Sequence, residues 1–402
     1  MRASVVLLVG LFCNFFGAYI VTKYADYAGV FDFSPFIPLG YEEGAIYDSI
    51  LVFALLSTIY YVFCKLKIGR SHKARVYVTR YKRGYLYYVM TAILLLFSIA
   101  ALLNINWTFS TISRGVGQFD RGFMSAISRL GILTFPLVII YTVAFWRYQT
   151  SKVVIILFVL LSILSEISNG DRRIVFSYLV MLVFFLFRND NGKIIKTIFS
   201  RKIIYLTMGF FCILISYIVR AEGTAKADYL IYGLLSGTIG GLGASQILAY
   251  VKYYVANTTG FLYGETFINY LIGIFTPSFI LYAFDGNEFY LRSSYLFNDL
   301  FNTNENMGYD FMLLADFYWN FGFFGYFMYA MLAISVTYFI VKHEKNHSDL
   351  KFGVAILLAV YFVSGQRSDF GFFLKSFCYC SLFYWFIYRL TPKELVRVKN
   401  EG

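Results

Sequence analysis

Apolar and polar segments alternate along the whole chain. About ten apolar segments have a length that suits a membrane-crossing helix, which needs roughly 20 residues. They cover residues 3–22, 47–64, 85–106, 130–146, 153–168, 174–187, 203–219, 313–341, 352–366 and 371–388. We therefore predict an all-α polytopic integral membrane protein with about ten transmembrane helices. We take the first segment as an uncleaved helix, because no clean small-residue cleavage site follows it.

Residues 220–312 interrupt this pattern. Two pieces of this segment, 229–250 and 267–284, are apolar enough to enter a bilayer. Either both cross it, which gives about twelve helices, or both lie at its surface, which leaves about ten. We favour the second arrangement, because the connection 251–266 contains a single basic residue, Lys252, too few for a cytoplasmic loop. No internal repeat divides the chain, so we predict one domain over residues 1–402.

Composition supports a lipid environment. The chain is 59% hydrophobic and 14% charged, whereas soluble domains carry about 25% charged residues. The net charge of +12 does not indicate nucleic acid, because the basic residues lie in short loops between apolar segments and form no separate basic groove.

A basic block at residues 65–84 sets the predicted orientation. Residues 65–83 of this block, KLKIGRSHKARVYVTRYKR, contain no acidic residue, and short basic loops of membrane proteins remain in the cytoplasm. Threading the segments from this block places both termini, including the tail 389–402, in the cytoplasm. The segment 220–312 then becomes a long outer loop, and we expect a function at the outer face.

Motifs for metals and nucleotides are lacking. The five cysteines form no CxxC pair and lie in or beside apolar segments, and of the three histidines two lie near one predicted cytoplasmic loop and the third in another. No P-loop or nucleophile elbow occurs. We predict no metal and no cofactor.

Arginines at the predicted outer ends of the helices are the first candidates for chemistry. The planar guanidinium donates two hydrogen bonds to phosphate oxygens and stays charged, so it suits a pyrophosphate at the membrane surface. Salt bridges to neighbouring acids, or simple snorkelling to the interface, would explain each arginine equally well. The outer-side arginines are Arg114, Arg121, Arg129, Arg172, Arg173, Arg220, Arg292 and Arg367. Among them we assign pyrophosphate binding to Arg172, Arg173, Arg220, Arg292 and Arg367.

The segment 308–327, GYDFMLLADFYWNFGFFGYF, holds the second set of candidates. Asp316 and Asn320 are four residues apart and share one helical face. A carboxylate there could accept a proton from a sugar hydroxyl, although an acid in the first turn of a helix also stabilises the helix dipole. Tyr318 and Trp319 suit either sugar stacking or an interfacial position.

Three stretches resemble the O-antigen polymerase family, the oligosaccharide repeat-unit polymerases of bacterial surface polysaccharide assembly. They are GFLYGETFINYLIGIFTPSFI (260–280), LLADFYWNFGFFGYF (313–327) and the arginine turns GDRR (170–173) and GQRSDF (365–370). The resemblance extends over the whole helix layout. It implies a membrane fold similar to that of the lipid-phosphate-sugar (GT-C-like) glycosyltransferases.

The resemblance also implies a reaction. Undecaprenyl-pyrophosphate-linked oligosaccharides would act as donor and acceptor at the outer face of the bacterial cytoplasmic membrane, with release of undecaprenyl pyrophosphate. We expect Asp316 first and Glu265 second as the catalytic acid or base, Asn320, Tyr318 and Trp319 as glycan-orienting residues, and a chain-length regulator as a further partner. The alternatives are a lipid-linked-oligosaccharide flippase and an O-antigen ligase; the histidine usual in the long outer loop of ligases does not occur in 220–312.

Overall fold

The structure is a computed structural model of the chain. It describes residues 5–28, 39–66, 77–81, 85–103, 134–145, 151–168, 177, 178, 180, 181, 184, 245–258, 260–276, 292–301, 311–344, 349–391 and 393–397. These residues are almost entirely helical, as predicted.

The helices of the N-terminal half are α1 (Val5–Ala28), α2 (Leu39–Lys65), α3 (Tyr85–Leu103), α5 (Thr134–Phe145) and α6 (Ser151–Ser168). Those of the C-terminal half are α11 (Ser245–Thr258), α12 (Glu265–Phe275), α14 (Ser293–Phe301), α15 (Leu313–Phe321), α16 (Phe323–His343), α17 (Asp349–Gly365) and α18 (Phe370–Leu390). The strands are β1 (Tyr77–Tyr81) and β2 (Lys393–Arg397).

Three helices in the described part of the chain are long and apolar enough to cross a membrane: Gly40–Lys65 of α2, α16 and α18. Each leaves large apolar side chains exposed, for example Leu51 (68%), Phe327 (59%) and Leu382 (63%). Extended apolar surface of this kind needs lipid or another protein to cover it. The chain is therefore a membrane-associated helical protein.

The other predicted segments are matched in part. Helices α1, α3, α5, α6 and α17 cover five of them. Residues 203–219 and most of 174–187 lie outside the described residues, as does the beginning of 229–250. Helix α12 overlaps the first part of the predicted segment 267–284, has 11 residues and is about 16 Å long, so this helix alone is too short to span a bilayer; residues 277–284 lie outside the described residues.

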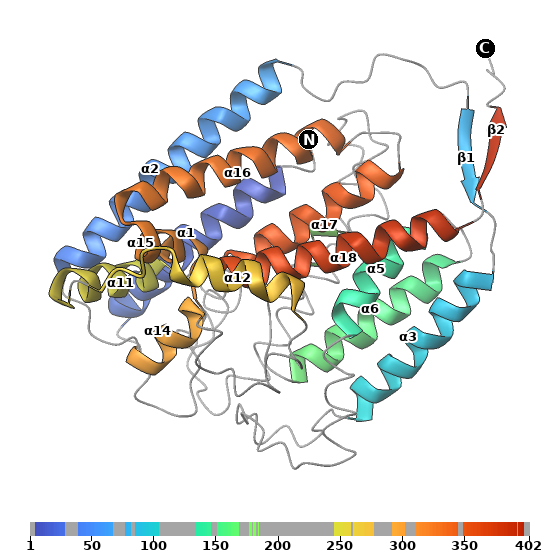
Figure 1. The fold of residues 1–402 in the computed structure, drawn as a ribbon, viewed down its shortest axis with the longest axis horizontal. Helices are drawn as coiled ribbons and strands as arrows, with labels where there is room; N and C mark the ends of the chain where they lie inside the picture. The colour runs from blue at the N-terminus through green and yellow to red at the C-terminus, as the bar shows by residue number, and fades with distance from the viewer. Residues whose placement is uncertain are drawn as a thin grey trace.

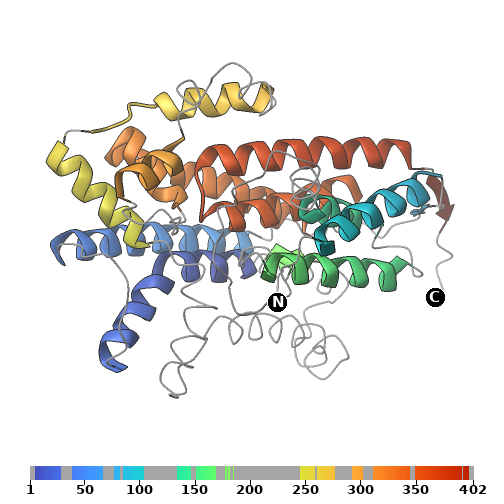
Figure 2. The same cartoon turned by 90° about the horizontal axis from the view of Figure 1, so that it is seen from below.

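The long helices run in broadly one direction, and the small elements gather at the two ends (Figure 1). Helices α11, α14 and α15 lie toward one end, α12 lies beside the first part of α18, and the β1–β2 ribbon lies at the other end; the view from below agrees (Figure 2). Helix α18 connects the two ends, because it begins beside α12 and stops just before β2. Its 21 residues correspond to about 30 Å, the thickness of a bilayer core.

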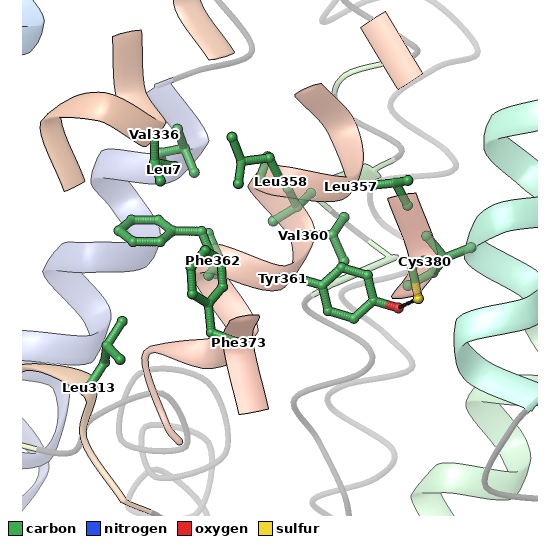
Figure 3. Close-up of a cluster of buried hydrophobic side chains, with 14 of the residues drawn as sticks. Leu7, Leu313, Val336, Leu357, Leu358, Val360, Tyr361, Phe362, Phe373 and Cys380 are labelled. Atoms are coloured by element: carbon green, nitrogen blue, oxygen red, sulfur yellow. Dashed lines mark hydrogen bonds between the residues drawn. The ribbon is translucent and has the colours of Figure 1, made fainter. Parts of the chain in front are cut away.

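Helix α17 forms the centre of the bundle. It packs against α1, α5, α16 and α18, and nearly every side chain from Phe352 to Gln366 is buried. A helix that is apolar on all sides suits such a position. Figure 3 shows part of this core, where the rings of Phe362 and Phe373 lie 5.7 Å apart and the Tyr361 hydroxyl lies 2.9 Å from the Cys380 sulfur.

The predicted segment 313–341 is divided into two helices. Helix α15 ends at Phe321 and α16 begins at Phe323, with Gly322 between them at φ 59° and ψ −139°. Side chains other than hydrogen disfavour this conformation. As a result, Asp316 belongs to a nine-residue helix outside the membrane-length helix α16.

Strands β1 and β2 form an antiparallel ribbon in which Thr79 is paired with Leu395. The sequence did not predict this ribbon. It joins part of the basic block 65–84 to part of the tail 389–402, two segments that are predicted to lie on the same side of the membrane.

Candidate functional site

Helix α15 carries the candidate site on one face. Asp316 and Asn320 lie on the same side of the helix, as predicted, and the Asn320 side-chain amide donates to Asp316 Oδ1 at 3.0 Å. Both residues are fully buried. Helices α12, α14 and α18 meet α15 at this face, so residues far apart in the sequence converge there.

Asp316 is surrounded by donors from three other elements. Ser293 at the start of α14 donates to Oδ1 at 2.6 Å, and the Tyr270 hydroxyl of α12 lies 3.5 Å from the same oxygen. The backbone N–H of Phe370, at the start of α18, donates to Oδ2 at 2.8 Å. The carboxyl group therefore fixes α12, α14 and α18 relative to α15.

Two hydroxyl groups extend the network. Thr266 of α12 donates to Asn320 Oδ1 at 2.8 Å, since this oxygen carries no hydrogen. Ser293 Oγ then lies 3.1 Å from Thr266 Oγ1 and 2.6 Å from Asp316 Oδ1, but has one hydrogen for these two contacts. The shorter contact, to Asp316, takes this hydrogen, and Ser293 Oγ accepts the Tyr270 hydroxyl at 3.0 Å.

The pKa of Asp316 is raised. Burial, followed by the negative charge of Asp369, raises the pKa from 3.8 to about 7, against the opposing effect of the hydrogen bonds from Phe370, Ser293 and Tyr270. Desolvation dominates because the carboxyl group has no contact with solvent. The Asp316 carboxyl group is consequently neutral below pH 7 and close to half ionised around pH 7.

Asp369 is the second buried acid of the site. Arg292 donates to it through Nε and Nη2, both at 2.9 Å, and the Ser294 hydroxyl donates to Oδ2 at 2.5 Å. Asp369 also caps α18, because its carboxylate accepts the N–H of Phe372 at 2.8 Å. The paired guanidinium of Arg292 is thus oriented by Asp369 and is 18% exposed.

Arg367 lies in the turn between α17 and α18. Gln366 anchors this turn, because its carbonyl accepts the N–H of Leu313 at 3.1 Å and its side chain accepts the Tyr329 hydroxyl at 2.7 Å. Arg367 is partly exposed and lies two residues before Asp369. The structure therefore brings Arg292, Arg367, Asp316 and Asn320 into one region, the polar cluster around α15.

The other predicted site residues take different positions. Glu265 is exposed in the first turn of α12, adjacent to Thr266 of the cluster. Trp319 is buried, and its indole N–H donates to the Gly260 carbonyl at 2.8 Å, so its ring faces protein. Tyr318 points to the opposite face of α15, where it stacks on Tyr326. Arg172, Arg173 and Arg220 lie outside the described residues.

The cluster is completed by four residues that were not predicted as site residues: Thr266, Tyr270, Ser293 and Asp369. Hydroxyl residues are common in loops and helices, so nothing in the sequence distinguished Ser293 from its neighbours. The position of Asp369 directly before the apolar segment 371–388 was the available signal, because aspartate is a preferred N-cap residue. In the described part of the chain no three His, Cys, Asp or Glu side chains lie together in a way that could hold a metal ion.

Comparisons with protein-family models, curated proteins and solved structures find no match to this chain.

Proposed function

We propose that the chain is a glycosyltransferase that polymerises undecaprenyl-pyrophosphate-linked oligosaccharide repeat units into O-antigen or a related surface polysaccharide. The supporting observation is the meeting of three stretches at one point. Residues 260–276, 313–327 and 365–370, the described parts of the stretches on which the family resemblance rests, are joined by the bonds Thr266 to Asn320 and Phe370 N–H to Asp316. These stretches are separated in sequence, so their convergence supports a common role.

In the proposed reaction, a hydroxyl of the acceptor glycan attacks C1 of the donor sugar. The new bond is C1–O to the acceptor, the broken bond is C1–O to the pyrophosphate, and the hydroxyl proton passes to a base. The leaving group takes the bonding electrons as undecaprenyl pyrophosphate, so no nucleotide is needed. Positive charge near the leaving oxygens would supply the main stabilisation of the transition state.

Arg367, with Arg172, Arg173 and Arg220, would neutralise the pyrophosphate. Arg292 would contribute through its orientation by Asp369, with guanidinium hydrogens beyond those bonded to that carboxylate facing the phosphates. Its fixed position lowers the entropy lost on binding a phosphate.

The burial of Asp316 favours a positioning role over that of base. Its oxygens accept bonds from Ser293, Asn320 and Phe370, and it orders the turn that carries Arg367. Glu265 is exposed beside the cluster, and we propose it as the better candidate for contact with an acceptor hydroxyl.

The proposed location is the bacterial cytoplasmic membrane, with both termini and the β1–β2 ribbon on the cytoplasmic side. The polar cluster lies at the other end of α18, about 30 Å away by helix length. This separation supports a site at the outer face, where flipped lipid carriers arrive.

The function is tested with purified protein in liposomes supplied with the lipid-linked repeat unit from a strain that lacks this protein. We expect a ladder of polysaccharide lengths on a gel and one undecaprenyl pyrophosphate released per bond. No ladder would contradict the proposal. In the deletion strain, surface lipopolysaccharide capped with a single repeat unit would indicate loss of a polymerase, whereas complete loss of surface glycan would indicate a flippase or a ligase.

Arg367→Ala, Arg172→Ala and Arg220→Ala should each leave the protein in the membrane and reduce polymerisation at least about 100-fold, the scale for loss of one oxyanion-type donor. Arg389→Ala is the control, because Arg389 is exposed at the opposite end of α18. Normal ladders from all three variants would exclude the arginine cradle.

A further inference from the structure

A second polar cluster lies on the other face of α15. Lys252 of α11 donates to Asp48 Oδ2 of α2 at 2.5 Å. The Tyr326 hydroxyl of α16 donates to the same oxygen at 2.6 Å. Three helices thus meet at one carboxylate, although Asp48 and Lys252 are separated by 204 residues.

The ion pair lies near one end of a membrane-length helix. Asp48 belongs to the membrane-length part of α2, Gly40–Lys65, and is the second residue of the predicted segment 47–64, a position where a charge costs less than at the bilayer centre. Well-packed apolar side chains generally hold two helices together at least as well as a buried ion pair. Yet both side chains remain partly exposed, Lys252 at 20% and Asp48 at 19%, so both can reach a ligand.

Aromatic rings surround the pair. The rings of Tyr318 and Tyr326 are stacked, with centroids 5.3 Å apart and an angle of 24° between the planes. Lys252 Nζ lies 5.9 Å from the centroid of Tyr318. The rings of Tyr41 and Tyr253 make an edge contact at the same pair of helices, α2 and α11.

The chemistry of this cluster fits a neutral molecule rich in hydroxyl groups. The charges of Asp48 and Lys252 cancel, so the cluster gives no net attraction for a phosphate. The carboxylate has lone pairs beyond the two bonds on Oδ2, and the ammonium carries three hydrogens. Together they can accept from and donate to neighbouring hydroxyls, while a half-buried tyrosine ring covers the C–H face of a sugar.

We propose that Asp48, Lys252, Tyr318 and Tyr326 bind an uncharged sugar residue of the repeat-unit glycan. This inference rests on the proposed polymerase function and gives it a second subsite, separate from the arginines. The pyrophosphate end of a substrate would contact the polar cluster around Arg292 and Arg367, and the glycan would extend across α15 to the Asp48–Lys252 pair. Helix α15 then lies between the two, which explains why both of its faces carry polar or aromatic residues.

The experiment measures polymerisation in liposomes and its inhibition by free repeat-unit glycan, released by mild acid from the lipid-linked pool of a strain lacking the protein. For Tyr318→Leu we expect at least a 10-fold rise in both KM and the inhibition constant of the free glycan, with kcat changed less than about twofold. Tyr318→Phe should recover most of the affinity. Tyr47→Leu is the control, because Tyr47 is 65% exposed beside Asp48 on α2 and lies outside the cluster.

Exchanging the two charges of the ion pair distinguishes a role in glycan binding from a role in holding α2 and α11 together. Asp48→Lys combined with Lys252→Asp restores an ion pair between α2 and α11, so protein amount and thermal midpoint should return to near wild-type values. Because the exchange moves the carboxylate from α2 to α11, the hydrogen bond from Tyr326 to Asp48 is lost. The inhibition constant of the free glycan should therefore remain at least 10-fold higher than that of the wild type. A wild-type inhibition constant in this double variant, or in Tyr318→Leu, would overturn the inference.

Failure of the subsite and failure of the proposed function give different results. If the wild type makes no polymer, the polymerase proposal fails, and saturation-transfer NMR of the free glycan with detergent-solubilised protein still tests the subsite. If the wild type polymerises and the Tyr318→Leu and double variants saturate normally, only the subsite fails.

Discussion

At the scale of single residues, Asp316 connects more elements of the candidate site than its neighbours do. It accepts hydrogen bonds from Ser293, Asn320 and the Phe370 N–H, and Ser293, Asn320 and Asp316 itself are fully buried. Each buried donor that loses its acceptor costs about 1–3 kcal/mol. Removing the carboxyl therefore affects four elements together.

Asp316→Ala is expected to lower the free energy of unfolding by at least about 3 kcal/mol, since three donors lose their acceptor. Asp316→Asn should cost less, because an amide resembles the neutral acid in shape and hydrogen bonding. Thermal unfolding of the purified variants in detergent measures both. Equal midpoints for Asp316→Ala and wild type would contradict the network described here.

The pKa of Asp316 also predicts a pH dependence. Its folded-state pKa of about 7 is above the ordinary value of 3.8, so the folded state binds the proton more tightly than the unfolded state. The stabilisation is complete below pH 4 and is lost as pH rises through 7. Raising the pH from 4 to 8 should therefore lower the thermal midpoint of the wild type relative to that of Asp316→Asn, whose amide does not titrate. A difference in midpoint that stays constant over this range would exclude the raised pKa.

The sequence predicts contacts between individual residues correctly where their spacing along one helix determines whether they meet. The four-residue separation of Asp316 and Asn320 was sufficient to place them together. The assignment of Arg292 to phosphate was incomplete, because its bond to Asp369 joins residues 77 positions apart. Local sequence carries no information about such a pairing, and the same holds for Lys252 and Asp48.

At the scale of elements, the break between α15 and α16 determines the shape of the site. Hydrophobicity alone predicts one helix over 313–341, since both helices are apolar. The two glycines of the sequence FGFFG were the signal for the break. Gly322 adopts a positive φ, and Gly325 lies so close to α15 that an added Cβ would be 2.0 Å from the Phe317 carbonyl oxygen.

Gly325→Ala should consequently destabilise the protein by more than about 3 kcal/mol, as overpacking against backbone leaves no flexible atom to move. Gly322→Ala should cost about 1–3 kcal/mol through backbone strain. Gly40→Ala is the control, because nothing lies within 4 Å of a Cβ at that position. Protein amount in membranes and thermal midpoint measure the effects; a stable Gly325→Ala variant would contradict the close packing of α15 on α16.

At the scale of the whole molecule, α18 separates the polar clusters from the ribbon. The predicted orientation places the basic block 65–84 in the cytoplasm, and the pairing of β1 with β2 requires the tail 393–397 to be on the same side. The sequence predicted this side for both segments through the distribution of Lys and Arg. It did not predict their contact, because strand pairing over more than 300 residues leaves no local pattern.

The orientation is tested by single cysteines in a cysteine-free variant. Tyr263→Cys, at a side chain that is 81% exposed before α12, should react with a membrane-impermeant maleimide in intact cells. Thr79→Cys in β1 should react only after the cells are permeabilised. The reverse result would place the candidate site in the cytoplasm and remove the basis for a reaction at the outer face.

The ribbon has a consequence for how the protein is made. More than 300 residues separate β1 from β2, so β1 leaves the ribosome long before its partner strand has been made. Domains generally fold from the N-terminus during synthesis, but the strand of the basic block must wait for β2 before its backbone can pair. A chain cut short before residue 393 would keep α18 and have an unpaired β1, whose exposed edge would distinguish it from the protein that carries both strands.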